Sequence, residues 1–258
     1  MAKSAEKYPQ KIALITGAAT GIGRETSLAF AQKDFKVVIS DINKDELLNT
    51  KSLIERSTEG EAEMIIADVS DPDDVKGMTD EIMNKFGRLD AACNNAGVEG
   101  VSASTGEYKL EDWDKVLNVN LRGQFLCMKH EIEIMLKTGG GSIINVSSIL
   151  GIVGFGNAPA YTAAKHGLIG LTKAAAIEYA PQKIRINAVC PGFIDTPMLE
   201  RAGITKDEDT LTYIRSLHPM ARLGKSEEVA NVIVWLASEE ASFITGHPLM
   251  VDGGYIAR

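Results

Sequence analysis

The sequence predicts an α/β fold, in which one doubly wound parallel sheet of about seven strands is covered by helices on both faces. Short apolar runs alternate with segments of helical length, the connections between them are short, and several runs end in glycine, asparagine or aspartate. Alternating strands and helices form a parallel sheet, because each crossover helix packs back onto it. With 258 residues, 45% of them hydrophobic, the chain 1–258 is expected to form a single domain.

The first predicted strand, Lys11 to Thr16, ends in a glycine-rich turn. The pattern G-x-x-x-G-x-G follows it and opens a helix that continues to about Gln32. Glycines allow a tight turn and close backbone approach, and the first turn of a helix presents unpaired N–H groups to a phosphate. The pattern predicts a pyrophosphate site, with a plain strand-to-helix turn as the alternative. The candidate residues are Gly17, Thr20, Gly21, Ile22 and Gly23.

The second predicted strand, Lys36 to Ser40, ends at Asp41 and Ile42. An acidic residue at this distance from the glycine turn meets the adenosine ribose in dinucleotide sites. Its charge would repel a 2′-phosphate, and the turn carries Thr20 rather than a basic residue, so NAD is favoured over NADP. The alternative is that Asp41 or Asn43 only caps the helix that begins near Lys44.

The third and fourth strands, Ala62 to Ala67 and Leu89 to Cys93, also end in polar residues. Ligands of doubly wound, Rossmann-like sheets bind beyond the carboxyl ends of the strands. The strand ends therefore place Asp68 and Val69, and Asn94, Asn95, Ala96 and Gly97, at the expected ligand edge.

Two helices are expected around the fourth strand. Asp71 caps the first, which continues to Phe86 with Pro72 at its first position. The second, about Leu110 to Lys137, carries an apolar stripe that is expected to face the core, with Asn120 one position off it. The stripe comprises Leu117, Leu121, Phe125, Met128, Ile132 and Met135.

The segment after the fifth strand, Ser142 to Ser148, carries reactive groups. A helix expected from Ala158 to about Ala180 places Tyr161 and Lys165 four residues apart on one face. A tyrosine that acts as a base near neutral pH needs its pKa lowered by about 3 units, and one cation about 4 Å away supplies energy of that order. A tyrosine and a lysine at this spacing also occur as an ordinary surface pair, so the spacing alone does not establish a site.

The sixth strand, Ile184 to Cys190, ends in Pro191 and Gly192. The residues 193–220 follow without clear strand character and are expected to form a substrate lid over the ligand edge. A helix from Ser226 to Ala237 and a short strand from Pro248 to Val251 complete the sheet.

Composition restricts the function. The net charge of −8 and the pI near 5.1 disfavour nucleic acid and anionic membranes as partners. No run of about 20 apolar residues predicts a membrane span, and the beginning of the chain has no secretory pattern, so a cytoplasmic protein is expected. The three cysteines and four histidines show no metal-ligand spacing, so neither a metal nor a disulfide is expected.

Taken together, these motifs resemble the short-chain dehydrogenase/reductase family across almost the whole chain. The T-G-x-x-x-G-x-G turn begins at Thr16, and the family's acidic residue, D-V pair and N-A-G match Asp41, Asp68-Val69 and Asn95–Gly97. The resemblance implies a catalytic tetrad of Asn120, Ser148, Tyr161 and Lys165. It also implies that Tyr161, Lys165, Pro191, Gly192, Ile194 and Thr196 contact the cofactor.

The implied activity is NAD(H)-dependent hydride transfer between nicotinamide and a secondary alcohol or ketone, with Tyr161 as acid and base. The segments 98–109 and 193–220 are mainly uncharged, which favours a small neutral substrate. One alternative is a 3-oxoacyl-[acyl-carrier-protein] reductase, disfavoured by Glu133 and Ile177 where basic residues are expected. A more remote alternative is a non-catalytic dinucleotide sensor.

The resemblance also implies a homotetramer. The helices 110–137 and 158–180 are apolar on more than one face, which predicts an interface on them. The alternative is that a single subunit covers both helices.

Overall fold

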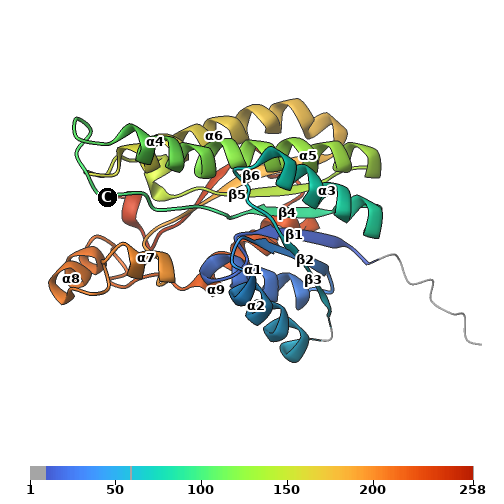
Figure 1. Ribbon diagram of the computed structural model, residues 1–258, viewed down its shortest axis with the longest axis horizontal. Helices are drawn as coiled ribbons and strands as arrows, with labels where there is room; N and C mark the ends of the chain where they lie inside the picture. Colours follow the sequence, from blue (N-terminus) through green and yellow to red (C-terminus); the bar gives the residue numbers. More distant parts are fainter. Residues whose placement is uncertain (1–9, 59, 258) are drawn as a thin grey trace, which may run out of the picture.

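Among residues 10–58 and 60–257, which the computed structural model describes, seven parallel strands form one sheet in the order β3-β2-β1-β4-β5-β6-β7 (Figure 1). This confirms the predicted fold class. The order reverses between β1 and β4, so the connections after these strands leave on opposite sides and open a crevice there. The strands are β1 (Ile12–Thr16), β2 (Lys36–Asp41), β3 (Ala62–Ile66), β4 (Ala91–Asn94), β5 (Gly141–Val146), β6 (Ile184–Pro191) and β7 (Pro248–Val251).

Helices cover both faces of the sheet (Figure 1). On one face lie α1 (Gly21–Ala31), α2 (Lys44–Ser57) and α9 (Ser226–Ala237), and on the other lie α3 (Pro72–Phe86), α4 (Leu110–Leu117), α5 (Gln124–Thr138) and α6 (Pro159–Tyr179). Neighbouring residues of β1 show why its sequence is continuously apolar. Leu14 packs into the core on the α3 side and Ile15 into the core on the α1 side, so both faces of the strand are buried.

Capping residues fix where two helices begin. Asp71 accepts a hydrogen bond from the backbone N–H of Asp73 at 2.8 Å, and Pro72 occupies the first position of α3, as predicted. Asn43 accepts from the N–H of Glu46 at 3.2 Å and caps α2. Of the two candidate caps for α2, Asn43 is therefore the one that the structure supports, and Asp41 is the last residue of β2.

The predicted helix from Leu110 to Lys137 is interrupted by a π turn, Asn118–Gly123, between α4 and α5. A π turn adds one residue, so the residue that follows Leu121 on the same face is five positions along rather than four. Phe125 was predicted to be core and is 44% exposed, whereas Leu126 is only 8% exposed. The prediction for Phe125 is wrong because the apolar stripe changes phase at the π turn.

The segment 193–220 contains two helices that the sequence pattern did not indicate, α7 (Pro197–Arg201) and α8 (Glu208–Ser216). They lie together beyond the carboxyl ends of the strands, on the same side of the molecule as the C-terminus (Figure 1). The segment therefore stands at the edge where ligands of such sheets bind.

Cys93 in β4, Cys127 in α5 and Cys190 in β6 are free, buried thiols. Burial raises the pKa of Cys190 to about 11, and it raises the pKa of the other two thiols as well. Across the part of the chain that the structure describes, no helix is both long and apolar enough to cross a bilayer.

Candidate active site

The glycine turn after β1 has a backbone that only glycine allows. Gly17 and Gly21 have φ angles of +64° and +55°. A Cβ on Gly23, in the first turn of α1, would lie 2.1 Å from the carbonyl oxygen of Gly17. Thr20 precedes α1 and Ile22 lies in its first turn. The tight turn and the free helix N-terminus fit a pyrophosphate, as the sequence predicts.

The loop after β4 packs directly against this turn. The Asn95 side chain donates to the carbonyl oxygen of Gly17 at 2.9 Å, and the Thr16 hydroxyl accepts from the N–H of Asn95 at 3.2 Å. A Cβ on Gly17 would lie 2.7 Å from the Cα of Ala96. The two loops at the topological switch point therefore form one rigid unit.

The end of β2 lies beside the same turn. One carboxylate oxygen of Asp41 accepts from the N–H of Ala19 at 3.1 Å, and the other accepts from the N–H of Asn43 at 2.9 Å. Arg24, which the sequence analysis did not single out, is committed elsewhere: its guanidinium pairs with Glu46 at 2.7 Å and donates to the Thr50 hydroxyl at 3.0 Å. A basic side chain is thus present near the turn, but a carboxylate already neutralises it.

The remaining predicted cofactor contacts lie along the same edge. Ile42 is 69% exposed, Val69 is buried, and the Asp68 carboxylate accepts from the hydroxyl of Ser70 at 2.7 Å. A cavity of about 750 Å³ opens beside Thr20, Gly21 and Asn43.

The segment after β6 closes over the glycine turn. A Cβ added to Gly21 would lie 3.2 Å from Cγ2 of Thr196, whose hydroxyl donates to the carbonyl oxygen of Ile194 at 3.2 Å. Gly192 is tied to β7, because its N–H donates to the carbonyl oxygen of Val251 at 3.0 Å. The chain therefore runs from the end of β6 to the start of α1 through the predicted cofactor contacts Pro191, Gly192, Ile194 and Thr196.

Asn120 lies in the π turn with its side chain fully buried. Its amide oxygen accepts from the N–H of Val98 at 2.8 Å, and its amide nitrogen donates to the carbonyl oxygen of Val98 at 2.7 Å. Gly97 must be small here, because a Cβ would lie 2.9 Å from that amide oxygen. The π turn is thus bonded to Val98, in the loop that follows β4.

Ser148, Tyr161 and Lys165 come together beyond β5. Ser148 lies two residues after the strand and hydrogen-bonds with the side chain of Tyr161. The Lys165 ammonium lies 5.4 Å from the centre of the Tyr161 ring and donates to the carbonyl oxygen of Val146 at 2.8 Å. The structure therefore places the three residues in one cluster, as expected from their order in the sequence.

The electrostatics of this cluster differ from the expectation. Burial raises the pKa of Tyr161 to about 12, the hydrogen bond with Ser148 lowers it, and Glu99 raises it. Burial also lowers the pKa of Lys165 to about 8. The sequence analysis predicted that a nearby cation, the lysine above all, lowers the tyrosine pKa. Here desolvation dominates, and the ammonium is bonded to a backbone carbonyl rather than to the phenol.

A buried polar network, which the sequence analysis missed, lies behind the site. Asn94 at the end of β4 donates to a carboxyl oxygen of Glu131 at 2.9 Å and to the amide oxygen of Asn145 at 3.2 Å. Within the described residues, the second carboxyl oxygen of Glu131 and the amide oxygen of Asn94 have no hydrogen-bond partner. Burial raises the pKa of Glu131 to about 8. A proton on Glu131 would supply the donor that the network lacks.

A family model described as enoyl-(acyl carrier protein) reductase matches residues 17–256. The chain belongs to the short-chain dehydrogenase/reductase family. The match spans the glycine turn, the Ser148, Tyr161 and Lys165 cluster and the segment 193–220. Members of this family are oxidoreductases that use a nicotinamide dinucleotide, and the glycine turn described above fits that cofactor.

Individual dehydrogenases and reductases of the family are similar over nearly their full length. Cyclohexanol dehydrogenase of Acinetobacter sp. (strain SE19) is 44% identical over 98% of this chain and 97% of its own. The 3-oxoacyl-[acyl-carrier-protein] reductase FabG of Thermotoga maritima is 43% identical over 95% of this chain and 98% of its own. A solved structure, ElxO with NADP bound, is 39% identical with a TM-score of 0.90, and the similarity covers 96% of this chain and 100% of that one.

Proposed function

We propose that this dehydrogenase transfers hydride between NAD(H) and a small, neutral, cyclic secondary alcohol or ketone. The observation that carries the proposal is the cluster of Ser148, Tyr161 and Lys165 beside the glycine turn. The similarity to a cyclohexanol dehydrogenase supports a ring-shaped substrate. A neutral substrate is supported by Glu99 and Arg201, which lie on the two segments expected to line the pocket and pair with each other at 3.2 Å.

Each residue of the cluster has a distinct task in the proposed reaction. The bound nicotinamide supplies or accepts the hydride. In the reductive direction Tyr161 donates its proton to the carbonyl oxygen, a task that a high pKa suits because the phenol stays protonated. Ser148 donates a hydrogen bond to the same oxygen and stabilises its developing negative charge.

In the oxidative direction Tyr161 must lose its proton before it can accept one from the alcohol. The Lys165 ammonium, 5.4 Å from the centre of the Tyr161 ring, favours the phenolate because opposite charges attract. Lys165 also holds the ribose hydroxyls in this proposal. Asn120 holds the Val98 backbone and supports a water relay that reaches Lys165.

A substrate panel tests the proposal. Purified protein is assayed with cyclic and linear secondary alcohols and with the matching ketones, each with NAD(H) and NADP(H), by the absorbance of reduced nicotinamide. We expect the highest kcat/KM for a cyclic alcohol with NAD. Binding of the dinucleotide without turnover of any substrate would instead favour a dinucleotide sensor.

We expect a preference for NAD that depends on Asp41. The Asp41→Ala variant should improve kcat/KM with NADP by about tenfold or more, because a like charge facing the 2′-phosphate costs on the order of 1 to 4 kcal/mol. Steady-state kinetics with both cofactors measure the change. Asp41→Asn keeps the length of the side chain but removes its charge, so its kcat/KM with NADP should improve similarly. A wild-type preference for NADP would contradict the proposal.

The rival function is reduction of 3-oxoacyl groups on acyl-carrier protein, which the 43% identity to FabG supports. Glu133 on α5 and Ile177 on α6, where basic residues would contact an acidic carrier, are 52% and 80% exposed respectively. An acidic carrier would meet repulsion at Glu133 and no attraction at Ile177. Measuring kcat/KM for acetoacetyl carrier protein and for a small acetoacetyl thioester without the carrier separates the two functions. A much higher value for the carrier protein would favour the rival.

We also propose a homotetramer with α5 and α6 at an interface. Leu126 and Ile134 lie off the predicted apolar stripe, but both are buried within one subunit and so do not support the interface. Phe125, Leu136 and Ile177 do support it, at 44%, 46% and 80% exposure. Light scattering at micromolar concentration should give about four times 27.8 kDa, a closed symmetric assembly being the general rule. A monomer mass would contradict the interface.

A further inference from the structure

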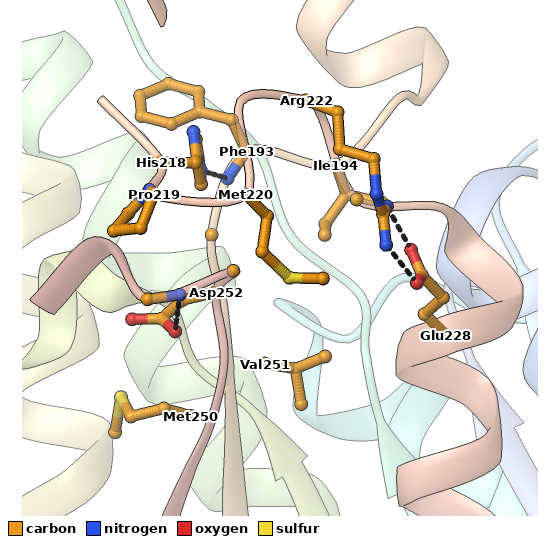
Figure 2. Close-up of a pocket in the computed structure, with 14 residues that line it drawn as sticks. Phe193, Ile194, His218, Pro219, Met220, Arg222, Glu228, Met250, Val251 and Asp252 are labelled. Carbon is orange, nitrogen blue, oxygen red and sulfur yellow. Dashed lines mark hydrogen bonds and ion pairs between the residues drawn. The ribbon is translucent and has the colours of Figure 1, made fainter. Parts of the chain in front are cut away.

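His218 lies between α8 and the segment after β6, and it lines a cavity of about 530 Å³ (Figure 2). It follows α8 and is only 2% exposed. One ring nitrogen, Nδ1, is 2.9 Å from the carbonyl oxygen of Ile214, and the other, Nε2, accepts from the N–H of Phe193 at 3.2 Å. A carbonyl only accepts, so the proton sits on Nδ1 and the lone pair of Nε2 faces Phe193.

The Phe193 N–H belongs to the segment that carries Ile194 and Thr196. The neighbouring N–H groups in that segment donate to backbone carbonyl oxygens. Gly192 donates to Val251 at 3.0 Å, and Asp195 donates to Gly224 at 2.9 Å. At Phe193 the N–H is instead held by a side chain, that of His218. The carbonyl oxygen of Phe193 also accepts from the N–H of Gly224 at 2.9 Å. The bond to His218 is therefore one of several that hold the segment, and it is one that a substitution can remove.

Packing leaves the His218 ring little freedom. Its centroid lies 5.8 Å from that of Phe193 and 5.3 Å from that of Tyr255. On the third side Gly192 is required, since a Cβ there would lie 2.9 Å from Nε2. The ring is thus held by α8 through Ile214, by the segment after β6 through Phe193, and by Tyr255 near the C-terminus.

The structure assigns to His218 the role of a positioning residue for cofactor binding. Its neutral ring holds the Phe193 N–H, and through it sets Ile194 and Thr196 at the place where the segment closes on the nicotinamide. This inference rests on the proposed function, because it takes that segment to be the nicotinamide contact. His218 itself touches neither substrate nor cofactor in this account.

Two amide substitutions separate the two ring nitrogens. In His218→Asn the amide nitrogen can occupy the place of Nδ1 and keep the bond to Ile214, but nothing reaches Phe193. In His218→Gln the longer side chain can bring its amide oxygen to the place of Nε2 and accept from Phe193. Both variants lose the ring that packs against Phe193 and Tyr255. If His218 had only a structural role, both substitutions should therefore change NADH binding to the same extent.

The measurements are the NADH Kd by fluorescence, kcat and the KM for NAD, and the melting temperature. We expect His218→Asn to raise the Kd and the KM about tenfold with kcat nearly unchanged, because a buried N–H has lost its acceptor. We expect His218→Gln to restore Kd and KM to within about threefold of wild type. Both variants should melt at similar temperatures.

Two controls keep the outcome decisive. The first control is His166→Asn. The His166 ring also contacts a carbonyl oxygen four residues earlier, that of Thr162 at 2.9 Å, but it lies away from this segment. This variant should bind NADH as wild type does. If His218→Asn does not fold, His218→Phe keeps a ring without an acceptor and should bind NADH as weakly. Equal Kd values for the asparagine and glutamine variants would overturn the positioning role.

The same measurements distinguish this inference from the proposed function. Wild-type protein that binds NADH but oxidises no alcohol would refute the proposed function and leave the comparison of Kd values intact. Wild-type protein that binds no NADH would overturn both.

Discussion

Replacing Tyr161 by phenylalanine should lower kcat by about a thousandfold, the middle of the range expected for loss of general acid–base catalysis. The change removes only the hydroxyl, which is the group that hydrogen-bonds with Ser148. The ring and its packing against the apolar cluster of Val116, Ala160 and Ala164 remain, so the NADH Kd should stay within about threefold of wild type. Steady-state kinetics and fluorescence titration measure the two effects separately.

A tyrosine on the same helix provides the control. Tyr179, the last residue of α6, also packs against the core, and Tyr179→Phe should leave kcat within about twofold. If Tyr161→Phe retained activity within tenfold of wild type, Tyr161 would not be the proton donor, and another acid would have to be sought in the cluster.

The protein should lose stability as the pH rises from about 5 to 8, because of Glu131. Its pKa is raised from 4.5 to about 8 in the folded state, so the folded protein holds the proton more tightly than the unfolded chain does. The resulting stabilisation is complete below pH 4.5 and is lost by the time the pH passes about 8. At about 1.4 kcal/mol per pKa unit the loss is on the order of 5 kcal/mol.

Denaturant unfolding at fixed protein concentration and a series of pH values measures this loss. Glu131→Gln carries an amide that cannot ionise, so its free energy of unfolding should lack this decline. Glu133→Gln, on an exposed face of the same helix, should decline as wild type does. Parallel pH curves for wild type and Glu131→Gln would show that Glu131 is not the group responsible.

Features that depend on local sequence were predictable. The strand β1, the glycine turn and the N-terminus of α1 follow one another within 12 residues, from Ile12 to Gly23, and each has its own signal: an apolar run, glycine spacing and a helix start. The same holds for Asp71, whose cap is specified by the residues beside it. The grouping of Ser148, Tyr161 and Lys165 also followed, because one strand end and one helical turn determine it.

Features that depend on tertiary surroundings were not predictable. The π turn at Asn118–Gly123 has no compositional signal, so the exposure of Phe125 could not be derived from a constant helical period. The Tyr161 pKa depends on how much protein surrounds the phenol, which sequence spacing does not give. His218 had no motif of its own, and only the fold brings its ring to Phe193.

The three buried thiols have a practical consequence for following how this protein opens. Cys93, Cys127 and Cys190 are buried, and their raised pKa values leave almost no thiolate at neutral pH, so an alkylating reagent finds no reactive partner in the native state. Because the thiols lie on β4, α5 and β6, each is exposed only when the central layers separate. The rate at which these cysteines are alkylated, followed by mass spectrometry, therefore reports the rate of unfolding without an introduced label.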